Sequence, residues 1–448
     1  MLISVLGAGY VGLVTAACLA KLGNEVRCID RDTARIEGLR HGVMPLHEPG
    51  LAELTAAGAA SGRLSFHAEQ AALHGTTLTI VAVGTLDGGG EWTADIVRRA
   101  VLDICRDSRA PRRVAVRSTL LPGTAVAIAR EAQLEAADVE IGHNPEFTRE
   151  GSAVNDFLNP DRVVIGVQDP ARPGPLAAAL RHIYEPLGAP IVLTDLTSAE
   201  TIKVASNVYL AAKITFANEL ARLCAATGAD VGAVVDGMGL DRRIGRNFLS
   251  PGPGFGGSCF PSQARALPGL AAQVGVRTQL MSAIWPSNAE QADWLAEGAE
   301  SALGGSLAGR RVALLGLTFK AGTDDLRESP ALRLSELIAA RGAELALYDP
   351  SGAERARAWL AERGHAAEAQ ADALAACAGA EVIVCATEWP EFRELDWSAV
   401  AGSTTGRLIV DARNVVDVAA AREAGFEVLA LGVAARQPAA EVTLPATS

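Results

Sequence analysis

The chain has 448 residues, more than one hydrophobic core usually organises, so we expect two or three domains. Hydrophobic residues make up 49% of the sequence and aromatic residues only 4%, which is typical of helices that cover the faces of an aliphatic sheet. The net charge of −12 argues against an extended surface for nucleic acid or for an anionic membrane, because both require clustered Lys and Arg.

Cysteine usage and hydropathy indicate a reduced, cytoplasmic protein. The seven cysteines form no CxxC pair, and residues 1–6 read as a strand and not as a cationic signal region. The longest nearly apolar stretch, 204–226, contains Asn207, Lys213 and Glu219, and it is too polar for a bilayer span. We therefore expect no membrane contact, and we assign no metal site.

The first thirty residues have the order strand, glycine turn, helix, strand and acid. Gly7 permits the tight turn, Gly9 lets a pyrophosphate approach the amides at the helix N-terminus, and Gly12 lets the helix pack closely on the strand. Asp30 follows at about the distance, ~20 residues, at which an acid binds the adenosine ribose and disfavours the 2′-phosphate of NADP. The pattern predicts an NAD site. We assign the cofactor to Gly7, Gly9, Tyr10, Val11, Gly12 and Asp30.

Two further strands, 78–83 and 113–117, are followed by small hydroxyl residues. In an open parallel sheet the ligand crevice lies beyond the carboxyl ends of the strands, so Thr85 and Thr119 belong near the cofactor. The alternative is that each is a helix N-cap, which is the commoner role of such residues.

The segment 143–151 reads HNPEFTREG and precedes another strand, 161–166. Pro145 keeps the preceding residue extended, so Glu146 and Glu150 are expected on a loop or in a first helical turn. Either carboxylate is alternatively a plain surface acid.

A long helix is predicted to begin at Thr197, because Thr197 and Glu200 have the spacing of a capping box and no Pro or Gly follows until Gly228. At 1.5 Å per residue this helix spans about 45 Å. Lys203 and Asn207 share one of its faces. A lysine beside an asparagine on a buried face favours contact with an anion, and the alternative is a snorkelling residue at the rim.

The segment 251–261, PGPGFGGSCFP, places Cys259 in a turn dense in glycine and proline. We expect Cys259 on a preset loop and not inside a helix or strand. The other six cysteines lie in apolar or helical runs, where a structural thiol is expected. A helical region then runs to about Ser301, and Gly304 opens a linker.

A second series of strands and helices occupies the C-terminal third, with strands at 311–317, 344–349, 381–386 and 408–411. It lacks a GxGxxG turn, so we assign it no second dinucleotide. The predicted fold is α/β, with two doubly wound Rossmann-like domains joined by a long central helix. The predicted divisions are an NAD-binding domain (1–196), a helical dimerisation domain carrying the Cys259 loop (197–303), a nucleotide-sugar domain (304–436) and a disordered tail (437–448).

In this order the motifs resemble the UDP-glucose/GDP-mannose dehydrogenase family along nearly the whole chain. The resemblance implies an NAD-binding N-terminal domain, a central dimer helix and a C-terminal domain that holds the nucleotide of a nucleotide sugar. It also implies that a primary alcohol is oxidised twice to a carboxylate, through a thiohemiacetal and a thioester on the cysteine. The similar segments are GAGYVG, MPLHEPGL, STLLPGT, NPEF, PDRVVIG, SAETIKVASN, FANE, DRRIG, GFGGSCFP, DDLRESPAL, YDP, TEW and VDARN.

By this resemblance Cys259 is the nucleophile, and Lys203 with Asn207 stabilises the alkoxide or oxyanion, as a cation and an amide do beside developing negative charge. Thr119 resembles a water-positioning hydroxyl, and Glu146 resembles an acid–base carboxylate. Further implied cofactor contacts are Thr85, Thr119, Glu150 and Arg327. Implied substrate contacts are Phe147, Arg149, Lys203, Asn207, Arg243, Phe255, Gly256, Lys320 and Arg413, with Arg243 reaching in from a partner subunit.

Four residues depart from the family pattern. Ser262 and Gln263 stand where Lys-Asp usually follows the cysteine motif, Thr148 stands for a leucine and Leu86 for a proline. Neutral Gln263 can form hydrogen bonds but cannot accept a proton at ordinary pH, so Glu146 or Glu150 would have to act on the hydrolytic water.

We therefore expect a homodimeric, NAD-dependent nucleotide-sugar dehydrogenase that carries an alcohol to a carboxylate. The first alternative is a dehydrogenase of a nucleotide or nucleotide sugar that stops at a ketone or aldehyde after two electrons. The second is a catalytically silent NAD-binding regulator. The dimer is expected because an almost wholly apolar long helix leaves too large an exposed patch on a monomer.

Overall fold

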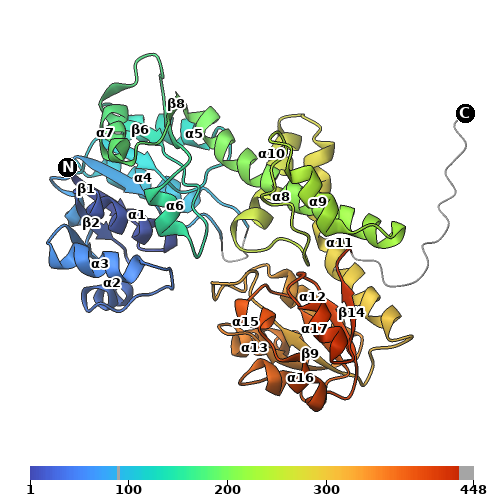
Figure 1. Ribbon diagram of the computed structural model, residues 1–448. Helices are drawn as coiled ribbons and strands as arrows, with labels where there is room; N and C mark the ends of the chain where they lie inside the picture. The colour runs from blue at the N-terminus through green and yellow to red at the C-terminus, as the bar shows by residue number, and fades with distance from the viewer. Residues whose placement is uncertain (88–90, 433–448) are drawn as a thin grey trace, which may run out of the picture. The chain divides into compact units, whose positions relative to one another are not determined.

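A computed structural model describes residues 1–87 and 91–432 of the chain, and the predicted disordered tail, 437–448, lies outside the described residues. The chain forms two compact units, Met1–Ser206 and Asn207–Ser448, each built on its own sheet (Figure 1). The predicted α/β class with two doubly wound sheets is confirmed, and the finer division into domains stays a prediction. Among the described residues, no helix has both the length and the apolar character needed to cross a bilayer.

The first unit contains an eight-stranded sheet with the order β3-β2-β1-β4-β5-β6-β7-β8. Neighbouring strands are parallel except for one antiparallel pairing of β6 with β7. The order reverses between β1 and β4, and a doubly wound sheet binds its ligand at the carboxyl ends of such strands. The strands are β1 (Leu2–Leu6), β2 (Glu25–Ile29), β3 (Leu64–His67), β4 (Leu78–Val81), β5 (Arg113–Val116), β6 (Glu140–His143), β7 (Val163–Val167) and β8 (Ile191–Asp195).

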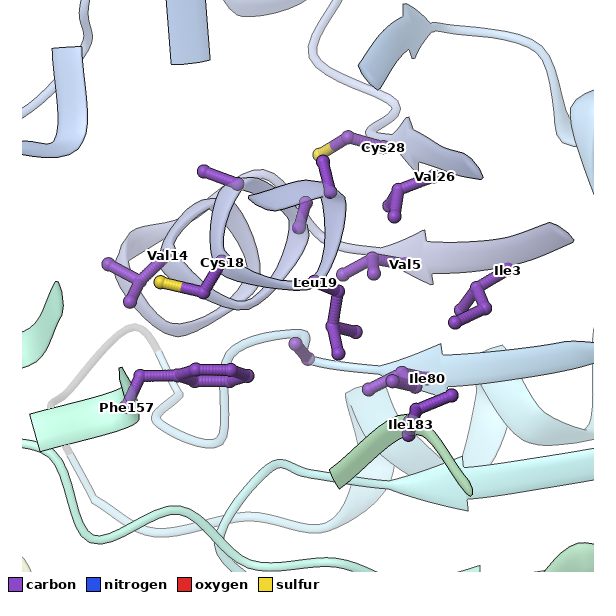
Figure 2. Packing of buried hydrophobic residues seen from close by; sticks show 14 of the residues in the cluster. Ile3, Val5, Val14, Cys18, Leu19, Val26, Cys28, Ile80, Phe157 and Ile183 are labelled. Carbon is purple, nitrogen blue, oxygen red and sulfur yellow. The ribbon is translucent and has the colours of Figure 1, made fainter. Parts of the chain in front are cut away.

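Both faces of this sheet are covered, so its central strands are apolar throughout. Ile80 of β4 packs in the cluster formed with α1, whereas its neighbour Val81 packs in the cluster formed with α4 and α5, as the alternation of a strand requires. Figure 2 shows Cys18 and Leu19 of α1 within the first cluster. The helices are α1 (Tyr10–Lys21), α2 (Thr33–Arg40), α3 (Leu51–Ala60), α4 (Asp95–Arg106), α5 (Thr124–Glu135), α6 (Ala153–Leu158) and α7 (Gly174–Tyr184), with 3-10 turns η1 (Gln70–Leu73) and η2 (Glu185–Leu187).

The predicted long helix is confirmed as α8 (Leu196–Thr227), whose 32 residues span about 48 Å. The predicted capping box is wrong. Asp195, the last residue of β8, caps the helix instead, because its carboxylate accepts hydrogen bonds from the amide and the hydroxyl of Ser198 at 2.8 and 2.6 Å. A strand that ends in aspartate directly at the first turn leaves Thr197 inside the helix.

Glu200 has a tertiary partner and does not reach back to the start of its own helix. Its two carboxylate oxygens accept the amides of Gly123 and Ala125 at 2.7 and 2.6 Å, so it caps α5. Glu200 is fully buried, and burial raises its pKa to about 7.

The second unit contains a six-stranded parallel sheet with the order β11-β10-β9-β12-β13-β14, which confirms the second doubly wound series. The helical region predicted after Cys259 consists of two helices, and Gly275, with φ of +77°, follows the end of the first. The strands are β9 (Arg311–Leu315), β10 (Glu344–Tyr348), β11 (Ala367–Ala369), β12 (Val382–Cys385), β13 (Leu408–Asp411) and β14 (Glu427–Ala430). The helices are α9 (Val231–Gly239), α10 (Cys259–Gln273), α11 (Gln279–Ala302), α12 (Pro330–Ala340), α13 (Ala353–Ala361), α14 (Ala373–Cys377), α15 (Pro390–Arg393), α16 (Trp397–Ser403) and α17 (Val418–Glu423).

Candidate active site

The glycine turn between β1 and α1 excludes side chains at two positions and is open at a third. A Cβ atom on Gly7 would lie 2.4 Å from the carbonyl oxygen of Ala82, and one on Gly12 would lie 1.9 Å from that of Gly7. A Cβ on Gly9 would meet nothing within 4 Å. Gly9 is also the N-cap of α1 and has no side chain to cover the first-turn amides. The turn therefore offers open backbone N–H groups to an anion such as a pyrophosphate.

Asp30 lies beside this turn. Its Oδ2 atom accepts the amide of Ala8 at 2.7 Å, and Arg35 approaches the same oxygen at 3.4 Å. The turn and the acid thus have the arrangement that a dinucleotide requires, and these residues fit NAD.

Thr85 and Thr119 follow the adjacent strands β4 and β5 at the same edge of the sheet. Neither is a helix N-cap, since α4 begins after Ala94 and α5 after Gly123, so that alternative is excluded. The indole of Trp92 donates to the carbonyl of Thr119 at 3.2 Å.

Glu48 was not predicted as a functional residue, although the motif around it stands out in the sequence. It is 5% exposed, and its Oε2 atom accepts the Tyr10 hydroxyl and the Gly151 amide, the latter at 2.7 Å. Its Oε1 atom accepts the amide of Ala153 at 2.6 Å. Burial and the neighbouring carboxylate raise the pKa of Tyr10. Glu48 therefore ties the cofactor turn to the segment that carries Glu150, and its only sequence signal was an acid flanked by histidine and proline.

Glu146 lies on the loop after β6, as predicted, and is buried, so it is not a surface acid. Its Oε1 atom accepts Lys203 Nζ at 2.9 Å. Its Oε2 atom accepts both the amide and the hydroxyl of Thr148, at 2.7 and 2.6 Å. Burial acts to raise the pKa of Glu146, but the charge of Lys203 and the hydrogen bonds from Thr148 and Lys203 outweigh it and hold the pKa well below its usual range.

Lys203 is 2% exposed, which excludes the alternative of a snorkelling rim residue. The anion that it meets in this chain is Glu146, and its Nζ also lies 5.4 Å from the centre of the Phe147 ring. Asn207 follows one helical turn later on α8 and is 8% exposed. Arg149, in contrast, pairs with Asp156 at 2.7 Å on the surface.

Cys259 is the first residue of α10, so the prediction that it lies outside any helix is wrong. The glycine-rich turn ends one residue earlier, at the N-cap Ser258, and the thiol is exposed at the helix N-terminus. The unpaired amides and the dipole of a first helical turn stabilise negative charge, which favours a reactive thiolate. The other six cysteines are buried, as predicted, and burial raises the pKa of each thiol.

The backbone before Cys259 packs against the segment 319–330 of the same unit. A Cβ atom on Gly256 would lie 2.4 Å from the carbonyl oxygen of Glu328, and one on Gly257 would lie 3.1 Å from the Phe319 ring. The amide of Gly257 donates to the carbonyl of Arg327 at 2.9 Å. Glycine is required here because the two segments touch through their backbones.

Three of the predicted ligand-binding residues lie in or beside this contact. Arg327 supplies the carbonyl just described, and Lys320 follows Phe319 in the chain. Arg413 donates to the carbonyl of Phe319 at 3.0 Å and pairs with Glu388 at 3.1 Å. Arg243 is not brought to this contact: its side chain is 89% exposed and pairs with Asp241.

Gln263 lies one helical turn after Cys259 and is 3% exposed. Its Oε1 atom has no hydrogen-bond partner among the described residues. Ser262 bonds back to the carbonyl of Ser258 at 2.7 Å. The position after the cysteine motif thus holds a buried, neutral acceptor and no base.

Asp349, at the end of β10, occupies in the second sheet the place that Asp30 occupies in the first. Its carboxylate accepts the amides of Leu317, Thr318, Ser351 and Gly352 at 2.7 to 3.0 Å. Backbone donors of the protein therefore occupy this carboxylate.

Three models of one protein family match successive parts of the chain. Residues 1–188 match the NAD binding domain of the UDP-glucose/GDP-mannose dehydrogenase family, 197–290 its central domain and 313–418 its UDP binding domain. The chain is 38% identical to a UDP-glucose 6-dehydrogenase of Rhizobium meliloti over 96% of this chain and 99% of the relative. It is 41% identical to that of Pseudomonas aeruginosa over 95% and 96%. A solved UDP-glucose dehydrogenase from Pyrobaculum islandicum superposes with a TM-score of 0.87, at 38% identity, over 97% of this chain and 98% of that one.

Proposed function

The chain belongs to the UDP-glucose/GDP-mannose dehydrogenase family, and from this premise we propose that it oxidises the primary alcohol of UDP-glucose to the carboxylate. It is an NAD-dependent nucleotide-sugar dehydrogenase; the proposal concerns the sugar, the base and the number of electrons. The observation that carries the four-electron reaction is the thiol of Cys259, exposed at a helix N-terminus while the other six thiols are buried.

When bound, NAD would supply the hydride acceptor for both oxidations. The residues of the chain bind NAD and orient it. We assign the pyrophosphate to the amides after Gly9, and the adenosine ribose to the carboxylate of Asp30. Tyr10, held by Glu48, orders the turn.

We assign the covalent step to Cys259. Its sulfur forms a bond to the carbonyl carbon of the aldehyde made in the first oxidation, and the carbonyl oxygen takes up the negative charge. Lys203 and Asn207 are the cation and the amide proposed to stabilise that oxygen, because preorganised donors in a site shielded from water lower the barrier to charge development. The second oxidation leaves a thioester on the sulfur.

We assign the hydrolytic water to Glu146, with Thr119 as a further hydroxyl for that water. The water oxygen bonds to the thioester carbonyl carbon, the C–S bond breaks, and the sulfur leaves with the electron pair as a thiolate. One proton of the water passes to Glu146 and then to solvent. Gln263 is excluded from this role because an amide cannot accept the proton.

We propose that the nucleotide sugar is bound by the residues that the family resemblance implies. The cations proposed for phosphate or sugar are Lys320 and Arg413, together with Arg243 from a partner subunit, whose exposure leaves it accessible to a second copy. The remaining proposed contacts are Phe147, Arg149, Phe255 and Gly256, and Glu150 and Arg327 are proposed for the cofactor.

A homodimer is proposed from α8. Tyr209, Phe216 and Leu223 follow one another at seven-residue intervals and are 66%, 50% and 58% exposed. Residues so spaced form one stripe along a helix, and large apolar side chains in a stripe mark an association surface.

The thiols, none of which forms a disulfide, further support a reducing, cytoplasmic location.

The test is to count NADH formed from limiting UDP-glucose with NAD in excess. We expect two NADH per sugar and a uronic acid product. A two-electron reaction is the second candidate, because Gln263 lacks the basicity that hydrolysis needs. One NADH per sugar, a carbonyl product and activity that survives C259A would establish that second candidate, and no NADH from any nucleotide would indicate a silent NAD-binding regulator.

A further inference from the structure

Thr148 gives both of its hydrogen-bond donors to one oxygen of Glu146. The amide lies 2.7 Å and the hydroxyl 2.6 Å from Oε2, while Lys203 lies 2.9 Å from Oε1. Three donors from two segments therefore hold one buried carboxylate. A threonine that served only packing would not need to direct its hydroxyl at this group.

We propose that Thr148 is a positioning residue that fixes the orientation of the Glu146 carboxylate, so that a single oxygen, Oε1, is left to take the proton of the hydrolytic water. The proposal rests on the proposed function, which gives the water to Glu146.

The lone pairs of the Glu146 carboxylate support this assignment. Each carboxylate oxygen has two in-plane acceptor sites. At Oε2 the amide and the hydroxyl of Thr148 fill both sites, whereas Lys203 fills one site at Oε1. Among residues 1–87 and 91–432, one acceptor site is therefore left on the carboxylate. Removing the hydroxyl would open a second site, on Oε2, so that the carboxylate would no longer present one acceptor site alone to the water.

The charges around Glu146 keep it ionised and ready for this role. Lys203 faces it from α8, and the histidine at the end of the preceding strand, His143, is held neutral because burial lowers its pKa to about 4. The guanidinium carbon of Arg162 lies 3.8 Å from the centre of the Phe147 ring, in a cation–π contact. The Thr148 hydroxyl adds to the stabilisation of the charged form, and its loss removes one of the three hydrogen bonds that fix the orientation of the carboxylate.

The test compares T148V, which is nearly isosteric and lacks the hydroxyl, with T148S, which keeps it. Loss of a hydrogen bond to a charged group predicts a fall in kcat of about tenfold to a hundredfold for T148V, with KM for UDP-glucose within about twofold. Because hydrolysis is the step affected, intact-protein mass spectrometry during turnover should show a covalent sugar-nucleotide adduct on Cys259 in T148V. T148S should retain most of the turnover and show little adduct.

T201V is the matched control, since Thr201 is exposed on α8 and its hydroxyl donates to the Thr197 carbonyl of the same helix at 2.7 Å. It should leave kcat, KM and the adduct level unchanged. Unchanged kcat in T148V, a rise in KM alone, or a fall in kcat without the adduct would each overturn the positioning role.

A second measurement separates this inference from the proposed function. Should the wild-type enzyme make no NADH from UDP-glucose, the proposed function has failed, and the contact is tested by thermal unfolding in a K203M background. In K203M, where Glu146 is present, T148V should lower the unfolding temperature. In K203M/E146A, where Glu146 is absent, T148V should leave the unfolding temperature unchanged. Equal losses in both backgrounds would show that the hydroxyl does not act through Glu146.

Discussion

Replacing Glu146 by glutamine should destabilise the first unit severely while barely changing its shape. Glu146 and Lys203 are 7% and 3% exposed at their side chains, and their charged atoms are 2.9 Å apart. At an effective dielectric constant of about 20, two unit charges at this distance attract by about 6 kcal/mol. E146Q removes this attraction and leaves an ammonium group buried without a counter-charge.

Breaking a buried pair by removing one partner costs about 3–5 kcal/mol, because the remaining charge keeps its desolvation penalty. For a unit of this size each kcal/mol lowers the unfolding temperature by about 2–4 °C. We therefore expect the first unit to unfold about 6–20 °C lower in E146Q, measured by differential scanning calorimetry.

The double variant E146Q/K203M is the control. It removes both charges and keeps side chains of similar length, and the amide oxygen of the introduced glutamine can still accept from Thr148. It should unfold at a higher temperature than E146Q alone, since no unpaired charge remains. An E146Q transition within about 3 °C of wild type, or a double variant no more stable than the single, would refute the reasoning.

Three further changes test other parts of the molecule. In the folded protein, burial raises the pKa of Glu200 to about 7, above its value in the unfolded chain. The stability that protonation of Glu200 contributes is therefore fully present below pH ~4.5 and is lost as the pH rises through 7. E200Q removes this titration. Urea titrations should show wild-type stability falling by about 3 kcal/mol more than that of E200Q between pH 4.5 and 8, and parallel curves would contradict this. F216E places a charge in the exposed stripe of α8 and should give a monomer mass by light scattering at micromolar concentration, whereas a persistent dimer would remove the stripe from the interface. Wild type should prefer NAD, and D30A should raise the ratio of kcat/KM for NADP to that for NAD; equal use of both by wild type would overturn the ribose assignment.

The periodicity of apolar residues and the positions of glycine and proline predict most of the fold. The glycine turn, the strands of both sheets and the length of α8 could be predicted, because each depends on residues close together in the sequence. The start of α8 could not be, since Thr197 and Asp195 are both good caps and the choice between them was made by where β8 ends. Glu200 was misassigned for a related reason: its partner, α5, lies far away in the chain.

The residues of the candidate site could be predicted from the sequence, but the contacts between them could not. Resemblance supplied Glu146 and Lys203, yet only the structure shows that they neutralise one another. Glu48 was missed because its three partners come from the cofactor turn and from the loop after β6. Thr148 was noted as a departure, and its hydroxyl acquires meaning only once Glu146 is seen beside it.

The backbone contact between the cysteine turn and the 319–330 segment bears on synthesis of the chain. Gly256 and Gly257 have no side chains to hold their conformation, and the groups that confine them are Phe319, Arg327 and Glu328. A nascent chain that has emerged only as far as α10 therefore carries an exposed thiol next to glycines that still lack these contacts. Because domains form in order as they leave the ribosome, we expect the thiol to reach its working position only after the first strand of the second sheet has been made, and truncation before Phe319 to yield a protein that binds NAD with Cys259 unplaced.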